Sequence, residues 1–96
     1  MDKISSTIVF RVHAVQRMFE RRISVGIVRQ VLLSGQMIED YSEDMPAPGG
    51  LISSQRGHRP LHVVMAENTE QAELVVITVY EPDPSQWNVG FRTRKE

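Results

Sequence analysis

Three side chains that can bind an anion and transfer a proton recur at helical spacing near the N-terminus. His13, Arg17 and Arg21 stand at positions i, i+4 and i+8, so in an α-helix they span only about 80° of the circumference. Imidazole exchanges protons near neutral pH, and guanidinium groups bind phosphate oxygens. The spacing indicates a candidate site for phosphate chemistry. The alternative is a solvated polar face, which is common on surface helices.

Two more candidates fall on predicted strands. His62 lies between apolar residues of the segment 60–66, where successive side chains point to opposite faces of a sheet. It is either an acid–base group or a core histidine whose nitrogens bond locally. Tyr80 ends the apolar segment 74–80, and its phenol either orients a phosphate or a base, or caps the core. The residues alone leave these alternatives open.

Other site chemistries have little support. The chain has no cysteine, which excludes a disulfide scaffold, a thiolate metal site and a cysteine nucleophile. His58 and His62 are four residues apart, but they fall on a predicted turn and a predicted strand rather than on a helix, where that spacing would pair them, and we discount a metal site. Gly49 and Gly50 are not followed by the lysine of a phosphate-binding loop. We therefore expect neither a metal nor a cofactor.

Two helices are predicted before residue 36. The first covers about 12–22, since its apolar residues share one arc of a helix and its polar residues share the opposite arc. Ser24 is a suitable N-cap for a second helix over about 25–34, which Gly35 ends. The arc expected to be buried in the first helix consists of Val12, Ala14, Val15, Met18 and Phe19.

Strand patterns follow the two helices. Short strands are predicted over 37–41, 51–55, 60–66 and 74–80. Pro82 and Pro84 end the last strand, and residues 90–96 are expected to fray. The predicted fold class is α+β, with two N-terminal helices packed on a curved, three- to four-stranded antiparallel sheet. We expect a single domain over 1–96 with an ordered core of about 8–88.

The 96 residues carry a formal net charge of −1, but the charges are segregated along the chain. Residues 1–35 are predominantly basic, whereas the charged residues within 36–48 and within 67–83 are all acidic. This distribution suits an anionic ligand on one face and a basic partner on another. No apolar run approaches the roughly 20 residues of a membrane span, and no secretory signal is recognisable. A cytoplasmic protein without a membrane anchor is therefore expected.

The segment His13–Ser24 resembles the motif His-Ala-x-x-Arg-Met-x-x-Arg-x-Ile-Ser of a family of small bacterial and archaeal domains of unknown function. Within it, Arg22 stands where relatives usually carry glycine. Further matches follow in the same order, and the resemblance covers about residues 10–87. The further matches are Gly35 and the segments 38–41, 60–64 and 77–83.

That family is similar to the RelE/ParE superfamily of toxin–antitoxin modules, in which two helices pack on a curved antiparallel sheet. Some members resemble mRNA-cleaving toxins that are encoded beside antitoxins with a zinc ribbon. The resemblance implies metal-independent endoribonuclease activity on mRNA, with a cognate antitoxin as the protein partner. In that reaction a ribose 2′-hydroxyl attacks its own phosphodiester and leaves a 2′,3′-cyclic phosphate.

The resemblance also implies roles for the candidate residues. His13 or His62 acts as base or acid. Arg17 and Arg21 neutralise the phosphate, and Tyr80 orients the nucleotide or donates a proton. The five side chains are then expected to converge on one RNA groove. Two alternatives stay open: a non-catalytic, RelE-like protein-binding module, and a toxin that inhibits a protein target without cleaving RNA.

Overall fold

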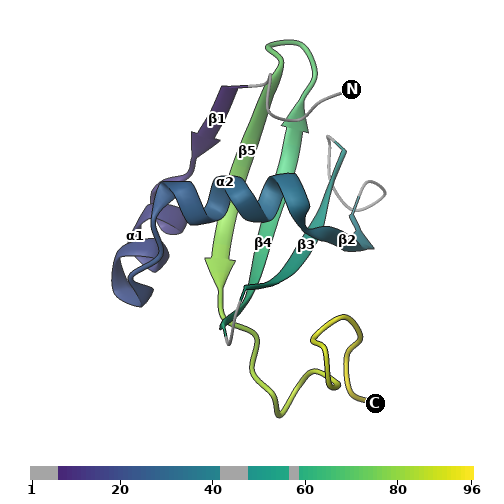
Figure 1. Cartoon of the computed structure of the whole chain (residues 1–96). Coiled ribbons are helices and arrows are strands. Elements are labelled where there is room, and N and C mark those ends of the chain that lie inside the picture. Colours follow the sequence, from purple (N-terminus) through teal and green to yellow (C-terminus); the bar gives the residue numbers. More distant parts are fainter. Residues whose placement is uncertain (1–6, 42–47, 57–58) are drawn as a thin grey trace.

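The computed structural model describes residues 7–41, 48–56 and 59–96. Two helices lie across one face of a five-stranded sheet (Figure 1). The elements in chain order are β1 (Thr7–Phe10), α1 (Val12–Arg21), α2 (Val25–Ser34), β2 (Gln36–Asp40), β3 (Gly49–Arg56), β4 (Arg59–Asn68) and β5 (Glu73–Tyr80). The strand order is β1-β5-β4-β3-β2. No described helix has the length and hydropathy that a membrane span requires.

Both helices are confirmed, and local chemistry accounts for their ends. Ser24 caps α2, because its side-chain oxygen accepts a hydrogen bond from the Ile27 N–H at 3.1 Å. α1 ends at Arg21, one residue earlier than predicted, because Arg22 adopts the left-handed conformation with φ of 56°. The Arg22 N–H then donates to the Phe19 carbonyl at 3.3 Å and closes the last turn.

Replacing Arg22 with glycine is expected to raise the free energy of unfolding by about 0.5–1 kcal/mol. A side chain in the left-handed region costs roughly 1–2 kcal/mol, which outweighs the roughly 0.5–1 kcal/mol of extra backbone entropy that glycine loses on folding. The matched control is Gln16→Gly, an exposed position in the middle of α1, which should lower the free energy of unfolding by about 1 kcal/mol. Urea unfolding of both variants tests the opposite signs, and a destabilised Arg22→Gly variant contradicts the argument.

The sheet differs from the prediction in its edge strand. β2, β3, β4 and β5 form the expected antiparallel meander. β1 is an additional strand, and it pairs in parallel with β5 from Thr7↔Glu73 to Phe10↔Val76. The expected three- to four-stranded antiparallel sheet is therefore corrected to a mixed, five-stranded sheet. A strand of only four residues carries little periodic signal, and its partner strand is the last one in the chain.

The hydrophobic core lies between the helices and the sheet. α1 contributes Ala14 and Met18, and α2 contributes Val28, Val31 and Leu32. The sheet contributes Ile52, Leu61, Val63, Met65, Leu74, Val76 and Val79. Burial of these apolar side chains on one side of the sheet is what holds α1 and α2 against it.

The other face of the sheet carries polar residues. Leu61 and Val63 face the helices, so the intervening His62 points to the second face. Ser53 and Tyr80 pair with His62 across the neighbouring strands, and residues that lie directly opposite one another share a face. The sheet therefore separates His62, Ser53 and Tyr80 from the hydrophobic core.

Residues 82–96, called the C-terminal strap below, pack against this second face. Trp87 and Arg94 form an antiparallel bridge within the strap, and Arg94 forms an ion pair with Glu39 of β2 at 2.8 Å. The sequence predicts that residues 90–96 fray, whereas in the structure the segment around Arg94 packs against the sheet. Terminal residues are usually mobile unless the domain holds them, and here the Glu39 carboxylate, distant in sequence, holds the strap.

Candidate functional site

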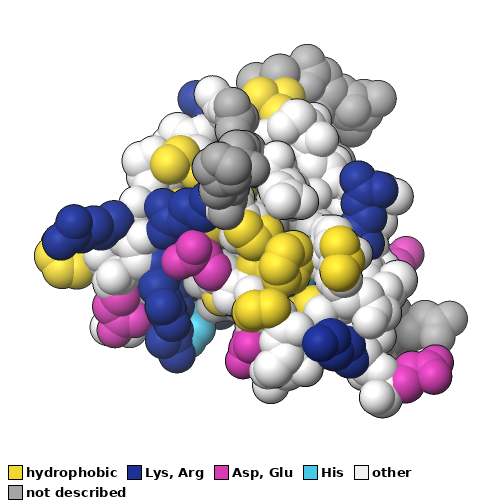
Figure 2. Space-filling model, turned by 60° about the horizontal axis from the view of Figure 1, so that its bottom comes forward, with side chains coloured by type: hydrophobic (Ala, Val, Ile, Leu, Met, Phe, Trp, Pro, Cys, Tyr) yellow, Lys and Arg dark blue, Asp and Glu magenta, His cyan; other side chains and the backbone are white. Residues whose placement is uncertain are grey.

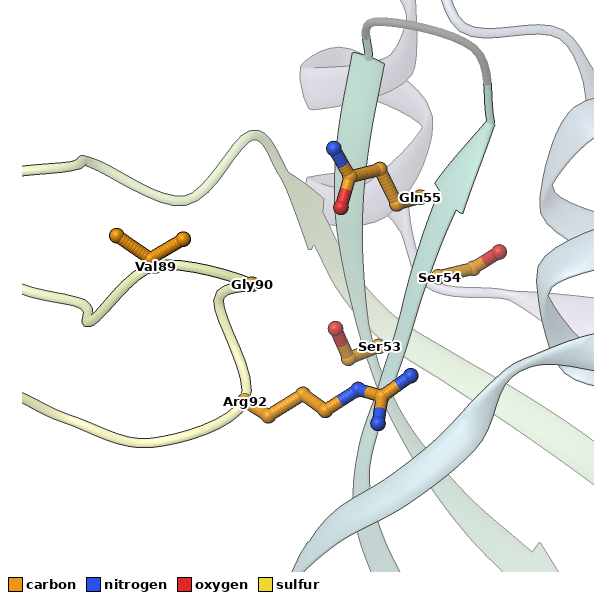
Figure 3. A pocket seen from close by; sticks show the side chains of 6 residues that line it. All are labelled: Ser53, Ser54, Gln55, Val89, Gly90 and Arg92. Carbon is orange, nitrogen blue, oxygen red and sulfur yellow. The ribbon is translucent and has the colours of Figure 1, made fainter.

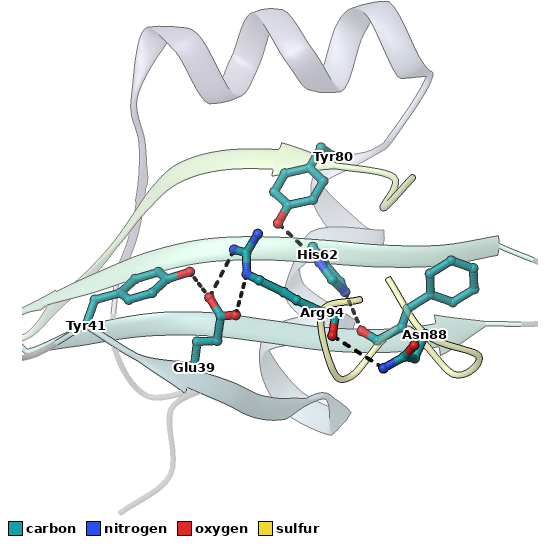
Figure 4. Close-up of polar contacts among 7 residues, drawn as sticks. Glu39, Tyr41, His62, Tyr80, Asn88 and Arg94 are labelled. Carbon is teal, nitrogen blue, oxygen red and sulfur yellow. Dashed lines mark hydrogen bonds and ion pairs between the residues drawn. The ribbon is translucent and has the colours of Figure 1, made fainter. Parts of the chain in front are cut away.

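His62 lies at the centre of a polar cluster between β4, β5 and the strap (Figure 4). Its side chain is fully buried, with 0% exposure. Nε2 lies 2.8 Å from the Phe91 carbonyl oxygen, and Nδ1 lies 3.2 Å from the Tyr80 hydroxyl oxygen. A carbonyl oxygen can only accept, so Nε2 carries the proton and Nδ1 accepts a hydrogen bond from the Tyr80 O–H. A neutral imidazole thus has both nitrogens satisfied.

The environment of His62 favours this neutral form. Burial lowers the pKa of His62 below its ordinary value of 6.5, although the hydrogen bond to Phe91 acts in the opposite direction. Burial also raises the pKa of Tyr80 above 10. Because the His62 ring has no exposed surface, an external substrate cannot reach it while the strap is docked.

Protein stability is expected to fall as the pH drops below 6.5, the ordinary pKa of the His62 side chain. The unfolded chain takes up a proton at His62 near pH 6.5, whereas the folded state, with its lowered pKa, takes it up only at lower pH. The free energy of unfolding should therefore change with a slope that approaches about 1.4 kcal/mol per pH unit between the two pKa values. Above pH 6.5, where His62 is neutral in the unfolded chain as well, the free energy of unfolding no longer loses anything to protonation of this residue.

Urea unfolding between pH 5 and 8 measures this slope, and His62→Gln provides the comparison. Glutamine keeps a hydrogen-bonding side chain at position 62 and does not titrate. The other histidines contribute equally to the pH slope of the wild type and of the variant. Identical pH slopes in the two proteins would contradict the assignment of the slope to His62.

Glu39 anchors the strap through Arg94. Arg94 donates from Nε to Glu39 Oε2 at 2.8 Å and from Nη2 to Oε1 at 3.2 Å, and the Tyr41 O–H donates to the same carboxylate. The hydrogen bond from Arg94 lowers the pKa of Glu39 below 4.5. Burial, reinforced by the carboxylate, raises the pKa of Tyr41 to about 12. The Arg94 guanidinium also lies 4.5 Å from the Trp87 ring centroid, and Trp87 contacts His62 edge-on at 4.5 Å between centroids.

The Glu39–Arg94 ion pair is expected to contribute about 1 kcal/mol to stability. Its bidentate geometry strengthens it, whereas the 55% exposure of the Arg94 side chain limits it through solvent screening. A double-mutant cycle with Glu39→Gln and Arg94→Gln isolates the coupling energy. The exposed Arg17–Glu20 pair at 3.3 Å is the matched control, with an expected coupling below about 0.5 kcal/mol. Equal couplings in the two cycles would contradict the prediction.

The remaining sequence candidates lie on α1. His13, Arg17 and Arg21 are all exposed, and Figure 2 shows basic side chains gathered on one side of the molecule beside a histidine. Arg17 pairs with Glu20, whereas the side chains of His13 and Arg21 form no hydrogen bond or ion pair with other described residues. The α1 face thus offers one imidazole and two guanidinium groups to solvent.

Arg59 extends this basic surface beyond the helix. It starts β4, and its guanidinium donates to the backbone carbonyls of Arg21 and Arg22, the latter at 3.3 Å. Its Nε also lies 3.2 Å from Glu81. Arg59 therefore neutralises part of the negative end of the helix dipole where α1 ends.

The structure brings together only two of the five predicted site residues. His62 and Tyr80 are hydrogen-bonded on the second face of the sheet, while α1 packs on the opposite face through Ala14 and Met18. Among the described residues, neither His13 nor the two α1 arginines form a hydrogen bond or ion pair with the His62–Tyr80 pair. The single groove that the sequence predicts is therefore not formed. His58 lies outside the described residues.

α1 buries a narrower arc than predicted. Ala14 and Met18 are buried, but Val12, Val15 and Phe19 are 73%, 50% and 85% exposed. α1 packs against β5 through Ala14 and Met18, and this contact does not cover the other three residues. The three exposed residues form an apolar stripe on α1, which the periodicity placed in the core.

Sequence reasoning missed the strap residues Trp87 and Arg94 and their anchor Glu39. The available signal was the position of Trp87, the single tryptophan of the chain, in a segment otherwise interpreted as loop and tail. A large aromatic side chain usually packs against other residues, even near a chain terminus. Within the described residues, no group of three or more histidine, cysteine, aspartate or glutamate side chains is placed to hold a metal ion.

Comparison with known proteins adds one match. A family model described as a domain of unknown function (DUF4258) matches residues 10–81. This segment covers α1 through β5 and ends immediately before the strap. No curated protein and no solved structure matches the chain.

Proposed function

The chain belongs to the DUF4258 family of domains of unknown function, and from its α1 face we propose that it is a toxin of a toxin–antitoxin module that cleaves RNA without a metal ion. The observation that carries the proposal is the exposed set His13, Arg17 and Arg21 on one side of a single helix. The exposed imidazole can accept a proton, and the two guanidinium groups on the same side of the helix can hold a phosphodiester.

The proposed reaction uses these groups as follows. The His13 imidazole accepts the proton of a ribose 2′-hydroxyl, and the 2′-oxygen attacks the adjacent phosphorus. Arg17 and Arg21 donate hydrogen bonds to the non-bridging oxygens, where negative charge accumulates. The bond to the 5′-oxygen breaks, and this oxygen takes a proton from the imidazolium or from water. The products are a 2′,3′-cyclic phosphate and a 5′-hydroxyl.

The buried pair His62–Tyr80 has a positioning role in this proposal. Its nitrogens and hydroxyl are occupied by contacts within the protein, so it holds β4, β5 and the strap together rather than touching RNA. The salt bridge from Glu20 to Arg17 is exposed and weak. A phosphate can replace the carboxylate at little cost.

Purified protein and a short oligoribonucleotide test the proposal. We expect cleavage in the presence of a chelator, with 2′,3′-cyclic phosphate ends. A 2′-deoxy substitution at the cleaved nucleotide should abolish cleavage at that position, because the attacking hydroxyl is gone. Induced expression should arrest growth with fragmented transcripts. Intact oligonucleotides together with intact transcripts would refute ribonuclease activity.

The proposal requires a cognate antitoxin that covers the α1 face. A short neighbouring reading frame is its expected source, and paired Cys-x-x-Cys motifs in that frame would indicate a zinc ribbon. Co-expression of such a protein should relieve growth arrest and should bind to the toxin. Full toxicity in the presence of every neighbouring gene product would count against the module.

A second candidate, a non-catalytic protein-binding module, is favoured by the exposed stripe Val12, Val15 and Phe19. Exposed apolar stripes on a helix often mark protein contacts. The same expression experiment separates the candidates. Growth arrest with intact RNA indicates a protein target, and the absence of arrest favours a binding module. In both of these cases Phe19→Ser should weaken partner binding, whereas it should leave RNA cleavage by a nuclease unchanged.

A further inference from the structure

A polar pocket of about 240 Å³ lies between β3 and the C-terminal strap. Six residues line it: Ser53, Ser54, Gln55, Val89, Gly90 and Arg92. Figure 3 shows the Arg92 side chain extending from the strap toward β3 beside Ser53. None of the lining residues is acidic, so the Arg92 guanidinium sets the charge of the pocket.

The donors in the pocket are largely unused. The side chains of Ser54, Gln55 and Arg92 form no hydrogen bond or ion pair with other described residues. The Ser53 hydroxyl donates to the Phe91 carbonyl at 3.3 Å and keeps its acceptor capacity. The Arg92 guanidinium, the Ser53 hydroxyl and the Gln55 amide therefore border this space, whereas the Ser54 side chain points away from the strap (Figure 3).

The pocket is built by the fold rather than by a chance approach of side chains. β2 pairs with β3 only as far as Gln36↔Ser53, so the edge of β3 beyond Ser53 is left to the strap. Gly90 and Phe91 have φ values of 90° and 58°, and this left-handed turn brings the strap back to β3. The Phe91 carbonyl then accepts from His62 Nε2 at 2.8 Å, which fixes the wall of the pocket to the buried cluster.

We propose that this pocket binds a phosphate group, either as the free ion or as the head of a small phosphomonoester. Arginine matches the planar oxygen pairs of phosphate with a bidentate fork, and hydroxyl and amide groups supply the further hydrogen bonds. A volume of about 240 Å³ lies below the roughly 300–1,000 Å³ of pockets that enclose drug-sized ligands. A phosphate with a short alcohol or sugar fits, and an oligonucleotide does not.

The site is distinct from the α1 face of the proposed ribonuclease. The pocket lies at β3, whereas α1 packs beside β5, and β4 runs between these two strands. The experiment can therefore fail without affecting the proposed cleavage, and a protein without nuclease activity can still show this binding.

Titration of the full chain with inorganic phosphate and with glycerol 3-phosphate, at constant ionic strength, tests the proposal by NMR. We expect amide shifts at residues 53–55 and 89–92. Arg92→Gln should weaken binding about tenfold or more, since it removes a charge-assisted pair of hydrogen bonds. Arg29→Gln, an exposed arginine on α2, is the control and should bind like the wild type.

The two ligands separate the two sources of phosphate. Tighter binding of glycerol 3-phosphate identifies an ester, and equal or tighter binding of inorganic phosphate identifies the free ion. Trp87 emission reports whether the strap remains docked in Arg92→Gln. Should that variant release the strap, Gln55→Leu removes the amide from the pocket without removing a charge and should also weaken binding, and wild-type affinity in Gln55→Leu would then count against the proposal. Shifts confined to α1 amides, or equal affinities in Arg92→Gln and Arg29→Gln with the strap docked, would overturn the proposal.

Discussion

The His13→Ala variant is expected to cleave RNA about 10²- to 10⁴-fold more slowly than the wild type. A positioned general base contributes a factor of this size, and His13 is the exposed imidazole of the α1 face. Arg17 and Arg21 remain, so substrate binding should change little and the loss should appear in kcat. Single-turnover cleavage of one oligoribonucleotide at saturating enzyme measures it.

The matched control for His13→Ala is Gln16→Ala, a neutral and exposed position on the same helix. It should retain the wild-type rate and stability, because surface substitutions usually change stability by less than about 0.5 kcal/mol. Arg21→Gln should weaken substrate binding and also lower kcat, since it removes a donor to the phosphate oxygens on which negative charge accumulates. If His13→Ala and Gln16→Ala cleave equally fast, the imidazole is not the base and the proposed mechanism is wrong.

Local patterns were sufficient to predict the two helices. Contacts between neighbouring residues fix both ends of α2. The Ser24 side chain accepts from the Ile27 N–H, and the Gly35 N–H donates to the Val31 carbonyl at 2.8 Å. Such contacts span three or four residues, and the sequence displays them directly. The central strands were predictable for a similar reason, because a β-branched apolar run such as 74–80 has few other stable conformations.

The site could not be predicted in the same way, because its contacts join residues that are far apart in the sequence. Glu39 and Arg94 belong to an early strand and to the C-terminal segment, and neither position carries a local signal for the other. His62 was predicted as one of two alternatives, and the choice between them depends on the strap that covers it. Periodicity shows which residues share a side of a helix, but not how many of them another element covers. The buried arc of α1 is therefore narrower than the predicted one.

The Trp87→Ala variant is expected to lower the free energy of unfolding by about 3–5 kcal/mol, the range for removing a large aromatic side chain from a packed site. Trp87 is only 3% exposed, and its ring contacts both His62 and Arg94. Its loss leaves a cavity over the buried imidazole and removes the surface on which the Arg94 guanidinium rests. Urea unfolding followed by far-ultraviolet circular dichroism measures the change.

Val89→Ala is the matched control within the same strap, because Val89 is fully exposed and should contribute less than about 0.5 kcal/mol. Hydrogen exchange adds a test of cooperativity. If the strap opens as a separate unit, amides of the strap should exchange faster than amides of β4 in the Trp87→Ala variant. The free energy of unfolding then falls by no more than the free energy with which the strap docks. If Trp87→Ala is no more destabilising than Val89→Ala and leaves the strap amides equally protected, the strap does not cover His62 in solution. His62 would then be exposed on the second face of the sheet, and it would again be a candidate for acid–base chemistry.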